Sequence, residues 1–330
     1  MTTSVQLSLF GTTTEIDAPA PLEVTSENCT VENANPTSDD QAQAVSTQWM
    51  PAAELPADIK QARWNQLLHE AIRQPGMLHQ CYTKFYQYSI GNLMLAAWQL
   101  LDRGIEFGPL ATFEQWKHKY GRHVRKGEKA IAMWMPMSVY VKEKDDNGNE
   151  VKTDRKRTIF VAKSQWFTLA QTEGDDLPPV QTPDWSIEQA LAELKIKQIA
   201  FDPLLVGVNC QGYATKRNIA INPACEKVLA TQLHEMAHVT LGHTDKEQLI
   251  ADGRKLTRSL MELEAESTAM ICLDALGFNE YAVYNRGYIQ HWMQAGGVTE
   301  IPEDSAKRIF SAADKILKAG QVKAVVAQAA

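Results

Sequence analysis

The sequence predicts an α+β fold of two domains, a mixed α/β domain followed by a mainly helical domain with a small sheet. The length of 330 residues suits two domains at about 100–200 residues each. Segments rich in β-branched and aromatic residues gather at 129–144 and 156–171, as expected for strands. Helical spacing of apolar residues dominates from residue 186 onward, interrupted by one short strand-like segment at 217–223.

Residues 1–50 have the composition of a disordered acidic tail. They contain seven acidic residues and no Lys or Arg. Few of their side chains are large and apolar, so burial cannot offset the entropy lost on ordering. An exception is QLSLF at 6–10, which resembles the peptide by which bacterial DNA-processing proteins dock on the sliding clamp; the alternative is an accidental pentamer. A flexible arm would present three apolar anchors and one polar contact, namely Leu7, Leu9, Phe10 and Gln6.

The first domain is expected at 51–177. Helical spacing predicts a helix before the Pro75-Gly76 stop, a second helix at about 89–103 and a short third helix in ATFEQWKHKYG. The two strand-like segments are joined by the turn-like DDNGN and should form a hairpin. A segment rich in Pro and acidic residues, TEGDDLPPVQTPDW, reads as the linker to the second domain.

Residues 117–129 suggest that the first domain binds nucleic acid. Six Lys or Arg and one Glu lie there, interleaved with aromatic rings and glycines. Cations neutralise phosphates and rings stack on unpaired bases, so single-stranded DNA is the expected partner; duplex DNA is disfavoured because no recognition-helix motif is visible. The alternative is a solvated basic loop with aromatic residues in the core. The candidate contacts are Lys84, Tyr88, Asn92, Trp116, Lys117, Lys119, Tyr120, Arg122, Arg125, Lys126 and Lys129.

The second domain, 178–330, carries the motif His234-Glu235-Met236-Ala237-His238. On a helix, residues four apart share a face, so both imidazoles can bind one metal ion. Glu235 is rotated off the ligand line and is suited to take a proton from a water at the metal. Gly242 is expected to end this helix, and His243 is expected to be a capping or surface residue rather than a ligand.

A third ligand is expected from a second helix, at about 253–276 and closed by Gly277. Glu262 and Glu266 lie four apart there, so Glu262 is the predicted ligand and Glu266 the predicted partner that orients a ligating histidine. Glu264 is the alternative ligand. Zn²⁺ is the expected ion, although Mn²⁺ or Co²⁺ would accept the same set.

Two sets of motifs resemble known families. LHEMAHVTLGH followed by MELEAESTAMIC resembles the gluzincin-type peptidases of the ImmA/IrrE group, whose third ligand is a Glu followed three residues later by Ala; Glu262 and Ala265 match. FYQYSIGNLMLAAWQ, ATFEQWKHKYGRHVRKGEKAIAMWMP and FTLAQTEGDDLP resemble the N-terminal domain of ArdC-type antirestriction proteins. The resemblance covers about 57–310. Where ArdC-type proteins often read ELVAE this chain reads ELEAE, which leaves the choice between Glu262 and Glu264 open.

The resemblance implies a single-stranded-DNA-binding domain joined to a Spartan-like, zincin-like zinc metallopeptidase that protects a conjugating plasmid from host restriction. Two alternatives remain: a DNA-coating protein whose metal site is structural, and a regulatory peptidase that cleaves a repressor. The segment RNIAIN is expected to be an edge strand that pairs with an extended substrate peptide. The sequence does not name the protein substrate.

The protein is expected to lie in the cytoplasm, without membrane contact. No stretch reaches the ~20 apolar residues of a membrane helix. The five cysteines are scattered and form no C-x-x-C pair, which favours a reducing compartment without a disulfide framework.

Overall fold

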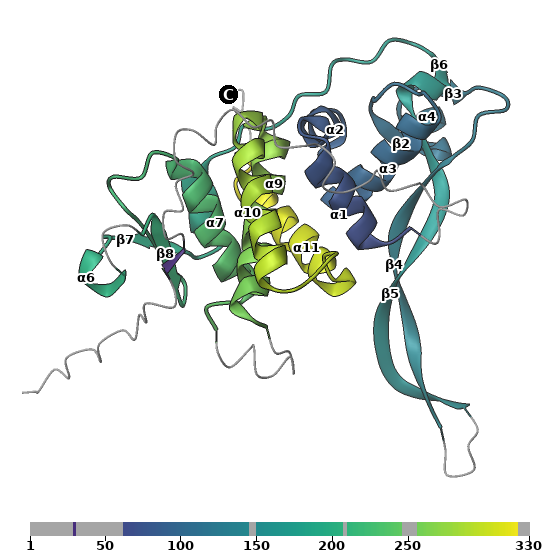
Figure 1. Ribbon diagram of the computed structural model, residues 1–330. Helices are drawn as coiled ribbons and strands as arrows, with labels where there is room; N and C mark the ends of the chain where they lie inside the picture. Colours follow the sequence, from purple (N-terminus) through teal and green to yellow (C-terminus); the bar gives the residue numbers. More distant parts are fainter. Residues whose placement is uncertain (1–28, 31–61, 145–149, 207–209, 246–255, 323–330) are drawn as a thin grey trace, which may run out of the picture.

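The structure is a computed structural model that describes residues 29–30, 62–144, 150–206, 210–245 and 256–322 (Figure 1). Nearly all of the predicted acidic tail lies outside this range. The predicted clamp peptide lies outside it as well, so docking of Gln6, Leu7, Leu9 and Phe10 on a sliding clamp stays a prediction.

The N-terminal half begins with three helices, α1 (Trp64–Arg73), α2 (Met77–Phe85) and α3 (Ile90–Asp102). The helices before Pro75 and over 89–103 were predicted, but α2 was not. It begins directly after Gly76, whose φ of 84° turns the chain, so the Pro-Gly pair separates two helices instead of starting a loop. A short helix, α4 (Phe113–Lys119), and a two-stranded sheet of β3 (Arg122–Val124) and β6 (Thr172–Gly174) follow.

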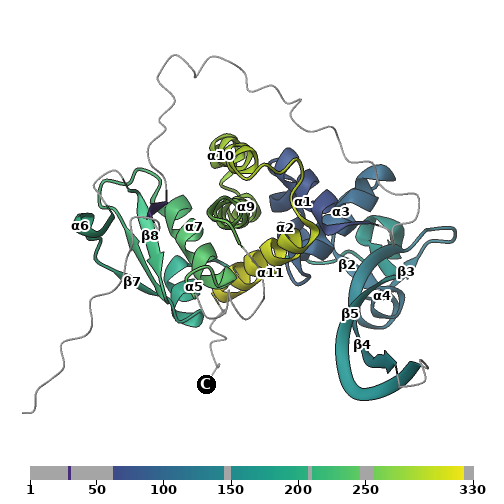
Figure 2. The same ribbon diagram turned by 60° about the horizontal axis from the view of Figure 1, so that its bottom comes forward.

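A long hairpin dominates this half, as predicted from the strand-like segments. Strands β4 (Ile131–Lys144) and β5 (Glu150–Thr168) pair antiparallel, and β2 (Leu110–Thr112) pairs with β5. Figures 1 and 2 show the hairpin projecting away from the helices. At its base, the side-chain amides of Asn92 and Gln99 exchange hydrogen bonds with the backbone of β4 at Trp134 and Ala132. Helix α3 therefore holds the open edge of β4 by side chains that mimic a strand.

The C-terminal half is mainly helical and has one four-stranded sheet of order β1-β8-β9-β7. The described strands are β1 (Cys29–Thr30), β7 (Lys197–Ile199), β8 (Gly212–Thr215) and β9 (Asn218–Ile221), and the described helices are α5 (Ile187–Glu193), α6 (Pro203–Val206), α7 (Val228–Leu241), α9 (Arg258–Leu276), α10 (Ala282–Ala295) and α11 (Glu303–Ala319). The predicted strand at 217–223 is present, but β9 lies between β8 and β7. The expectation that RNIAIN is an edge strand is therefore wrong, because both of its edges are paired within the sheet.

Helix α9 is the centre of the molecule and joins the two halves. It is buried from Glu262 to Ala275 and contacts α7, α10, α11 and α2 (Figure 2). One hydrophobic cluster includes residues of α1–α3 together with residues of α7, α9 and α11. The helices of both halves therefore share a core.

Three carboxylates of the C-terminal helices cap the three N-terminal helices. Glu303 accepts hydrogen bonds from two backbone N–H groups at the start of α1, Asp274 from two at the start of α2, and Asp314 from one at the start of α3. Helix N-termini carry unpaired N–H groups and a partial positive charge, which makes a carboxylate a favourable partner. Burial raises the pKa of Asp274 and of Asp314, while these hydrogen bonds oppose that shift.

Asp274→Ala is expected to destabilise the whole chain by about 2 kcal/mol, since it removes two charge-assisted hydrogen bonds at a buried helix start. Urea unfolding followed by circular dichroism measures this. Asp304→Ala, an exposed acid on α11, is the matched control and should change the free energy of unfolding little. Equal effects of the two substitutions would contradict the capping role of Asp274.

None of the helices in the described part of the chain combines the length and apolar character that a bilayer span requires. Cys81, Cys225 and Cys272 are free thiols. Cys210 is disulfide-bonded, which the scattered spacing of the cysteines did not predict because pairing depends on the fold.

Candidate metal centre

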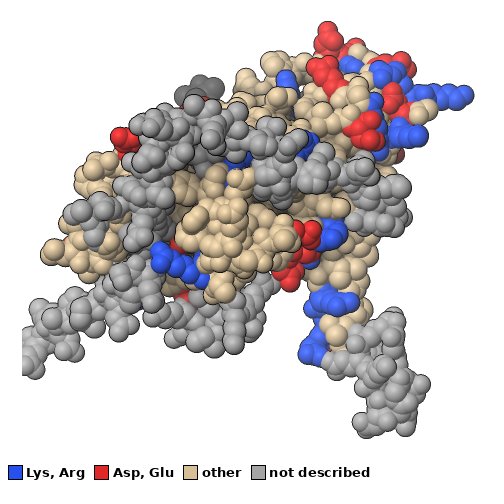
Figure 3. All heavy atoms as spheres, in the orientation of Figure 1, with Lys and Arg blue, Asp and Glu red and all other residues tan. Residues whose placement is uncertain are grey.

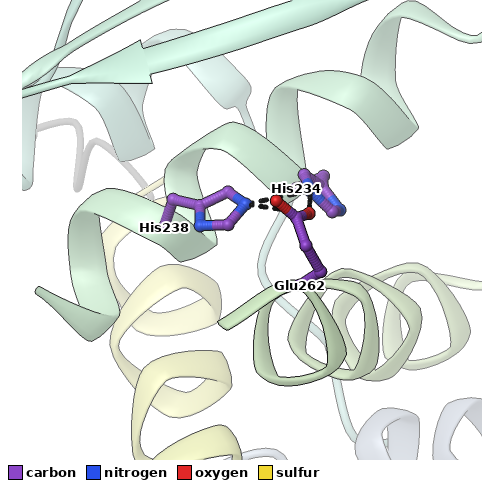
Figure 4. A group of neighbouring side chains, drawn as sticks. All are labelled: His234, His238 and Glu262. Atoms are coloured by element: carbon purple, nitrogen blue, oxygen red, sulfur yellow. Dashed lines mark hydrogen bonds and ion pairs between the residues drawn. The ribbon is translucent and has the colours of Figure 1, made fainter. Parts of the chain in front are cut away.

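His234, His238 and Glu262 converge between α7 and α9 (Figure 4). The two Nε2 atoms are 3.1 Å apart. Glu262 Oε2 lies 3.3 Å from Nε2 of His234 and 3.5 Å from Nε2 of His238. All three residues are buried. The helix repeat places the imidazoles on one face of α7, and the neighbouring helix supplies the carboxylate.

The residues fit a divalent metal ion. Ligand bonds of about 2.0–2.2 Å in tetrahedral geometry place the ligand atoms roughly 3.3 Å from each other. The three separations observed here scatter around that value. Burial of two imidazoles and a carboxylate facing one another is costly unless a shared cation or protons compensate the charge. Among the described residues this is the group whose donor atoms meet in the way a metal requires.

His234 is oriented by Glu266. The Nδ1 atom of His234 lies 2.9 Å from Glu266 Oε2, so Nδ1 carries the proton and Nε2 faces Glu262. Burial lowers the pKa of His234, but the hydrogen bonds to Glu262 and Glu266 outweigh burial and raise it well above its usual value. Burial likewise opposes ionisation of Glu262, yet the adjacent His238 and His234 lower its pKa. Glu266 thus lies where the sequence placed the orienting partner.

His238 is oriented by a different group, His243. Nδ1 of His238 lies 3.0 Å from Nδ1 of His243, and Nε2 of His243 lies 3.0 Å from Glu264 Oε2. Arg308 of α11 donates to the same carboxylate oxygen and to the carbonyl of Leu241. Glu264 can only accept when ionised, so His243 donates to it through Nε2 and accepts at Nδ1 from His238. Because His238 donates to His243 through Nδ1, its Nε2 carries no proton and is available to a metal.

His243 is not a ligand and its backbone caps the end of α7, as expected, but it is not a surface residue, because its side chain is only 2% exposed. A surface position for His243 assumes that α7 continues beyond Gly242. Gly242 instead ends α7, as predicted, with a φ of 80°, and the N–H of His243 bonds to the carbonyl of His238. The left-handed glycine folds the chain back, which places the two imidazoles in contact.

Glu264, the alternative ligand, lies on the other side of α9. It is fully buried and bonds His243 and Arg308. Burial raises its pKa, but the contacts with His243 and Arg308 outweigh this and lower it. Residues two apart on a helix point in different directions, so Glu262 and Glu264 reach different partners.

Glu235, the predicted base, is fully buried on α7 beside His234. Strand β8 approaches it closely at Gly212: a Cβ atom there would lie 3.2 Å from Glu235 Oε1 and 2.8 Å from Thr231 Cγ2. The glycine leaves room for the carboxylate beneath the sheet, so the position of Glu235 depends on β8 as well as on its own helix.

His243→Ala is expected to weaken metal affinity about 10–100-fold, because it removes the group that fixes the tautomer of His238. Competition with a chromogenic chelator measures this affinity. His118→Ala replaces an exposed histidine on α4 and serves as the control. An affinity equal to that of the control would show that His243 does not position His238.

The predicted DNA contacts separate into two groups in the structure. Lys119 extends over the ring of Tyr120, 5.2 Å from its centroid. The exposed members of the predicted set are Lys84, Lys117, Lys119, Arg125, Lys126 and Lys129. These side chains are accessible to a ligand.

The remaining predicted DNA contacts make structural interactions. Trp116 is fully buried and donates from its indole N–H to the carbonyl of Phe167. Arg122 is buried and bonds Thr172 and the backbone of 172–175. Asn92 binds the backbone of β4, and Tyr88 donates to the carbonyl of Leu110. As placed here, Trp116 cannot stack on a base without leaving the core.

The basic segment 117–129 lies beside acidic residues that are distant from it in the sequence. Pairing of β3 with β6 sets His123 opposite Glu173, and Asp175 and Asp176 follow directly along the chain. Figure 3 shows acidic and basic side chains mixed over this part of the surface. The attraction of 117–129 for phosphates is therefore weaker than its composition suggests.

Comparisons with known proteins match the first half of the chain to a family. Residues 44–168 match the family model of the N-terminal domain of anti-restriction factor ArdC. The solved structures include the metal-free antirestriction ArdC protein from plasmid R388 (20% identity, TM-score 0.45), covering 78% of this chain and 94% of that chain. The Mn(II)-bound structure of the R388 protein matches at 15% identity and a TM-score of 0.41, covering 78% of this chain and 97% of that chain. Comparison with curated proteins gave no match. Residues 44–168 are therefore similar to the N-terminal domain of ArdC-type antirestriction proteins.

Proposed function

We propose that this protein is a single-stranded-DNA-binding antirestriction protein with a divalent-metal-dependent peptidase site. The observation that carries the peptidase assignment is the group of His234, His238 and Glu262 with Glu235 beside it. Three protein ligands are typical of catalytic metal sites, whereas structural sites are closed by a fourth. Zn²⁺ is the proposed ion, and Mn²⁺ or Co²⁺ fit the same donors.

A metal ion bound by these donors would polarise the carbonyl of a peptide and make a water molecule more acidic. Glu235 would accept the proton of the attacking water and deliver it to the leaving amine. Glu266 and His243 hold the two imidazoles so that each presents Nε2. Gly212 of the neighbouring strand β8 leaves room for the carboxylate of Glu235.

The match of 44–168 to the ArdC N-terminal domain supports the antirestriction role and the DNA-binding role. Exposed cations on α4 and after β3 suit a polyanionic partner. A protein of this kind would coat incoming single strands and act on a protein bound to them.

Transfer of unmodified plasmid DNA into a restricting host tests the proposal as a whole. The full chain should raise the yield of transferred plasmid, and purified protein should contain about one divalent ion per chain and bind labelled single strands. A chain that gives no protection, or that binds neither metal nor single strands, would contradict the proposal. Protection without peptide cleavage would instead support a DNA-coating protein whose metal is structural.

A further inference from the structure

The distal part of the β4–β5 hairpin is exposed on both faces. Residues opposite one another in an antiparallel pair share a face, and the register pairs Pro136 with Phe160, Ser138 with Thr158 and Tyr140 with Lys156. We call the face formed by these six residues the arm face. Phe160 is 59% exposed and Tyr140 50% exposed. Two large exposed rings therefore lie on one face of this element.

The arm face has a rigid aromatic base. Trp134, next along the same face, stacks on Trp64 with ring centroids 3.9 Å apart. Trp64 in turn meets the ring of Phe160 edge-on at 6.1 Å. Gly91 lies beneath the Trp64 ring, where a Cβ atom would lie 2.4 Å from it. The arm therefore leaves the core at a fixed angle set by stacked rings.

The spacing and chemistry of the arm face suit unpaired bases. Phe160 and Lys156 are four positions apart on β5, and Tyr140 pairs with Lys156, so the positions of Phe160 and Tyr140 lie about 13 Å apart along the arm. Between them, Ser138 and Thr158 are small, polar and exposed. Lys156 extends over the Tyr140 ring at 5.0 Å, so that a stacked base and the phosphate of its nucleotide would meet adjacent groups.

The hairpin, residues 131–168, contains seven Lys or Arg against five acidic residues, and most of its cations belong to β5. Residues 153–163 contain Arg155, Lys156, Arg157 and Lys163 against one acid, Asp154. Figure 3 shows Lys and Arg side chains along the hairpin. The basic segment 117–129, in contrast, lies beside the acidic residues of 173–176. Lys156 lies on the arm face itself, whereas Arg157 and Lys163 pair with Val139 and Met133 and lie on the opposite face of the same narrow ribbon. Exposed rings with cations close by suit single strands that are bound without reading their sequence.

We propose that the arm face is the surface on which bases of single-stranded DNA stack, with Phe160 and Tyr140 as the platforms and Lys156 as a phosphate contact. The proposal rests on the proposed function, since it locates the DNA that the first half of the chain binds. It assigns the hairpin, rather than 117–129, as the site of base contact.

Fluorescence anisotropy of the full chain with a labelled oligothymidylate of roughly 20 nucleotides, longer than typical site sizes, tests this. Phe160→Ala and Tyr140→Ala should each weaken binding about tenfold and leave the salt dependence unchanged, because stacking involves no counterion. Lys156→Gln should make the salt slope shallower by about 0.7, the contribution of one phosphate contact. Met137→Ala, an exposed apolar residue on the opposite face, is the control and should bind like the unaltered chain.

Photo-cross-linking with oligonucleotides that contain 5-iododeoxyuridine gives a readout independent of affinity. Adducts are expected on Phe160 or Tyr140. Adducts confined to Tyr120, or normal affinity of both alanine variants, would show that DNA does not stack on the arm face. Either result would leave single-strand binding by the protein itself intact. Displacement of the DNA by polyglutamate at equal concentration would reassign the face to an acidic protein. If the unaltered chain binds no single strand, the proposed function itself fails, and the arm proposal fails with it.

Discussion

Glu262→Ala is expected to abolish stoichiometric metal binding. The carboxylate lies within 3.5 Å of Nε2 of both ligating histidines, and its loss leaves two neutral imidazoles to hold the ion. Structural zinc in zinc-finger peptides binds with about 10–16 kcal/mol over four ligands; by that measure one ligand contributes roughly 3 kcal/mol, or about 100-fold in affinity. Elemental analysis after gel filtration, followed by chelator competition, gives both the stoichiometry and the affinity.

Glu264→Gln is the matched control for Glu262→Ala, because the two carboxylates lie on the same helix and are both buried. This variant is expected to retain the metal with a modestly lower affinity, because Glu264 holds His243 against His238, and to unfold more easily, since it weakens the contacts with His243 and Arg308. If the Glu264→Gln protein lost the metal and the Glu262→Ala protein kept it, Glu264 would be the ligand instead of Glu262. That result would contradict the geometry described above.

Glu235→Gln is expected to slow peptide cleavage by about 10²–10⁴-fold, the usual contribution of a positioned general base. The amide preserves the size of the side chain but cannot accept the proton. Metal content and single-strand affinity should both be unchanged, because Glu235 is neither a predicted ligand nor part of the arm face. Cleavage is followed by mass spectrometry of a peptide library incubated with the full chain.

Plasmid protection by the Glu235→Gln chain then separates the functional alternatives. Lost protection together with intact DNA binding supports a peptidase-dependent antirestriction protein. Full protection would favour DNA coating with a structural metal. Cleavage unaffected by the substitution would contradict the assignment of Glu235 as the base.

The sequence predicted the parts of the site that depend on local helix geometry. His234 and His238 lie one helical step apart, and so do Glu262 and Glu266, so a period of 3.6 residues suffices to place each pair on one face. Gly242 and Gly277 were predicted as helix ends for the same local reason, and both have positive φ values. The hairpin strands followed from two segments rich in β-branched and aromatic residues.

The parts that were missed depend on contacts between distant segments. Arg308 supports the metal site from α11, and no local pattern links it to Glu264. The position of His243 required knowing that a left-handed residue reverses the chain. Strand pairing placed RNIAIN in the middle of the sheet and set acidic residues beside the basic segment. Burial of Trp116 could not be distinguished from a stacking role, because an aromatic residue near cations fits either.

Anomalous diffraction from crystals of the full chain grown with zinc tests most directly whether His234, His238 and Glu262 bind one ion. A single strong peak is expected between α7 and α9, about 2 Å from Nε2 of each histidine and from a carboxylate oxygen of Glu262. The absence of a peak at this position in zinc-loaded crystals, or a peak ligated by other residues while these three side chains point apart, would contradict the account.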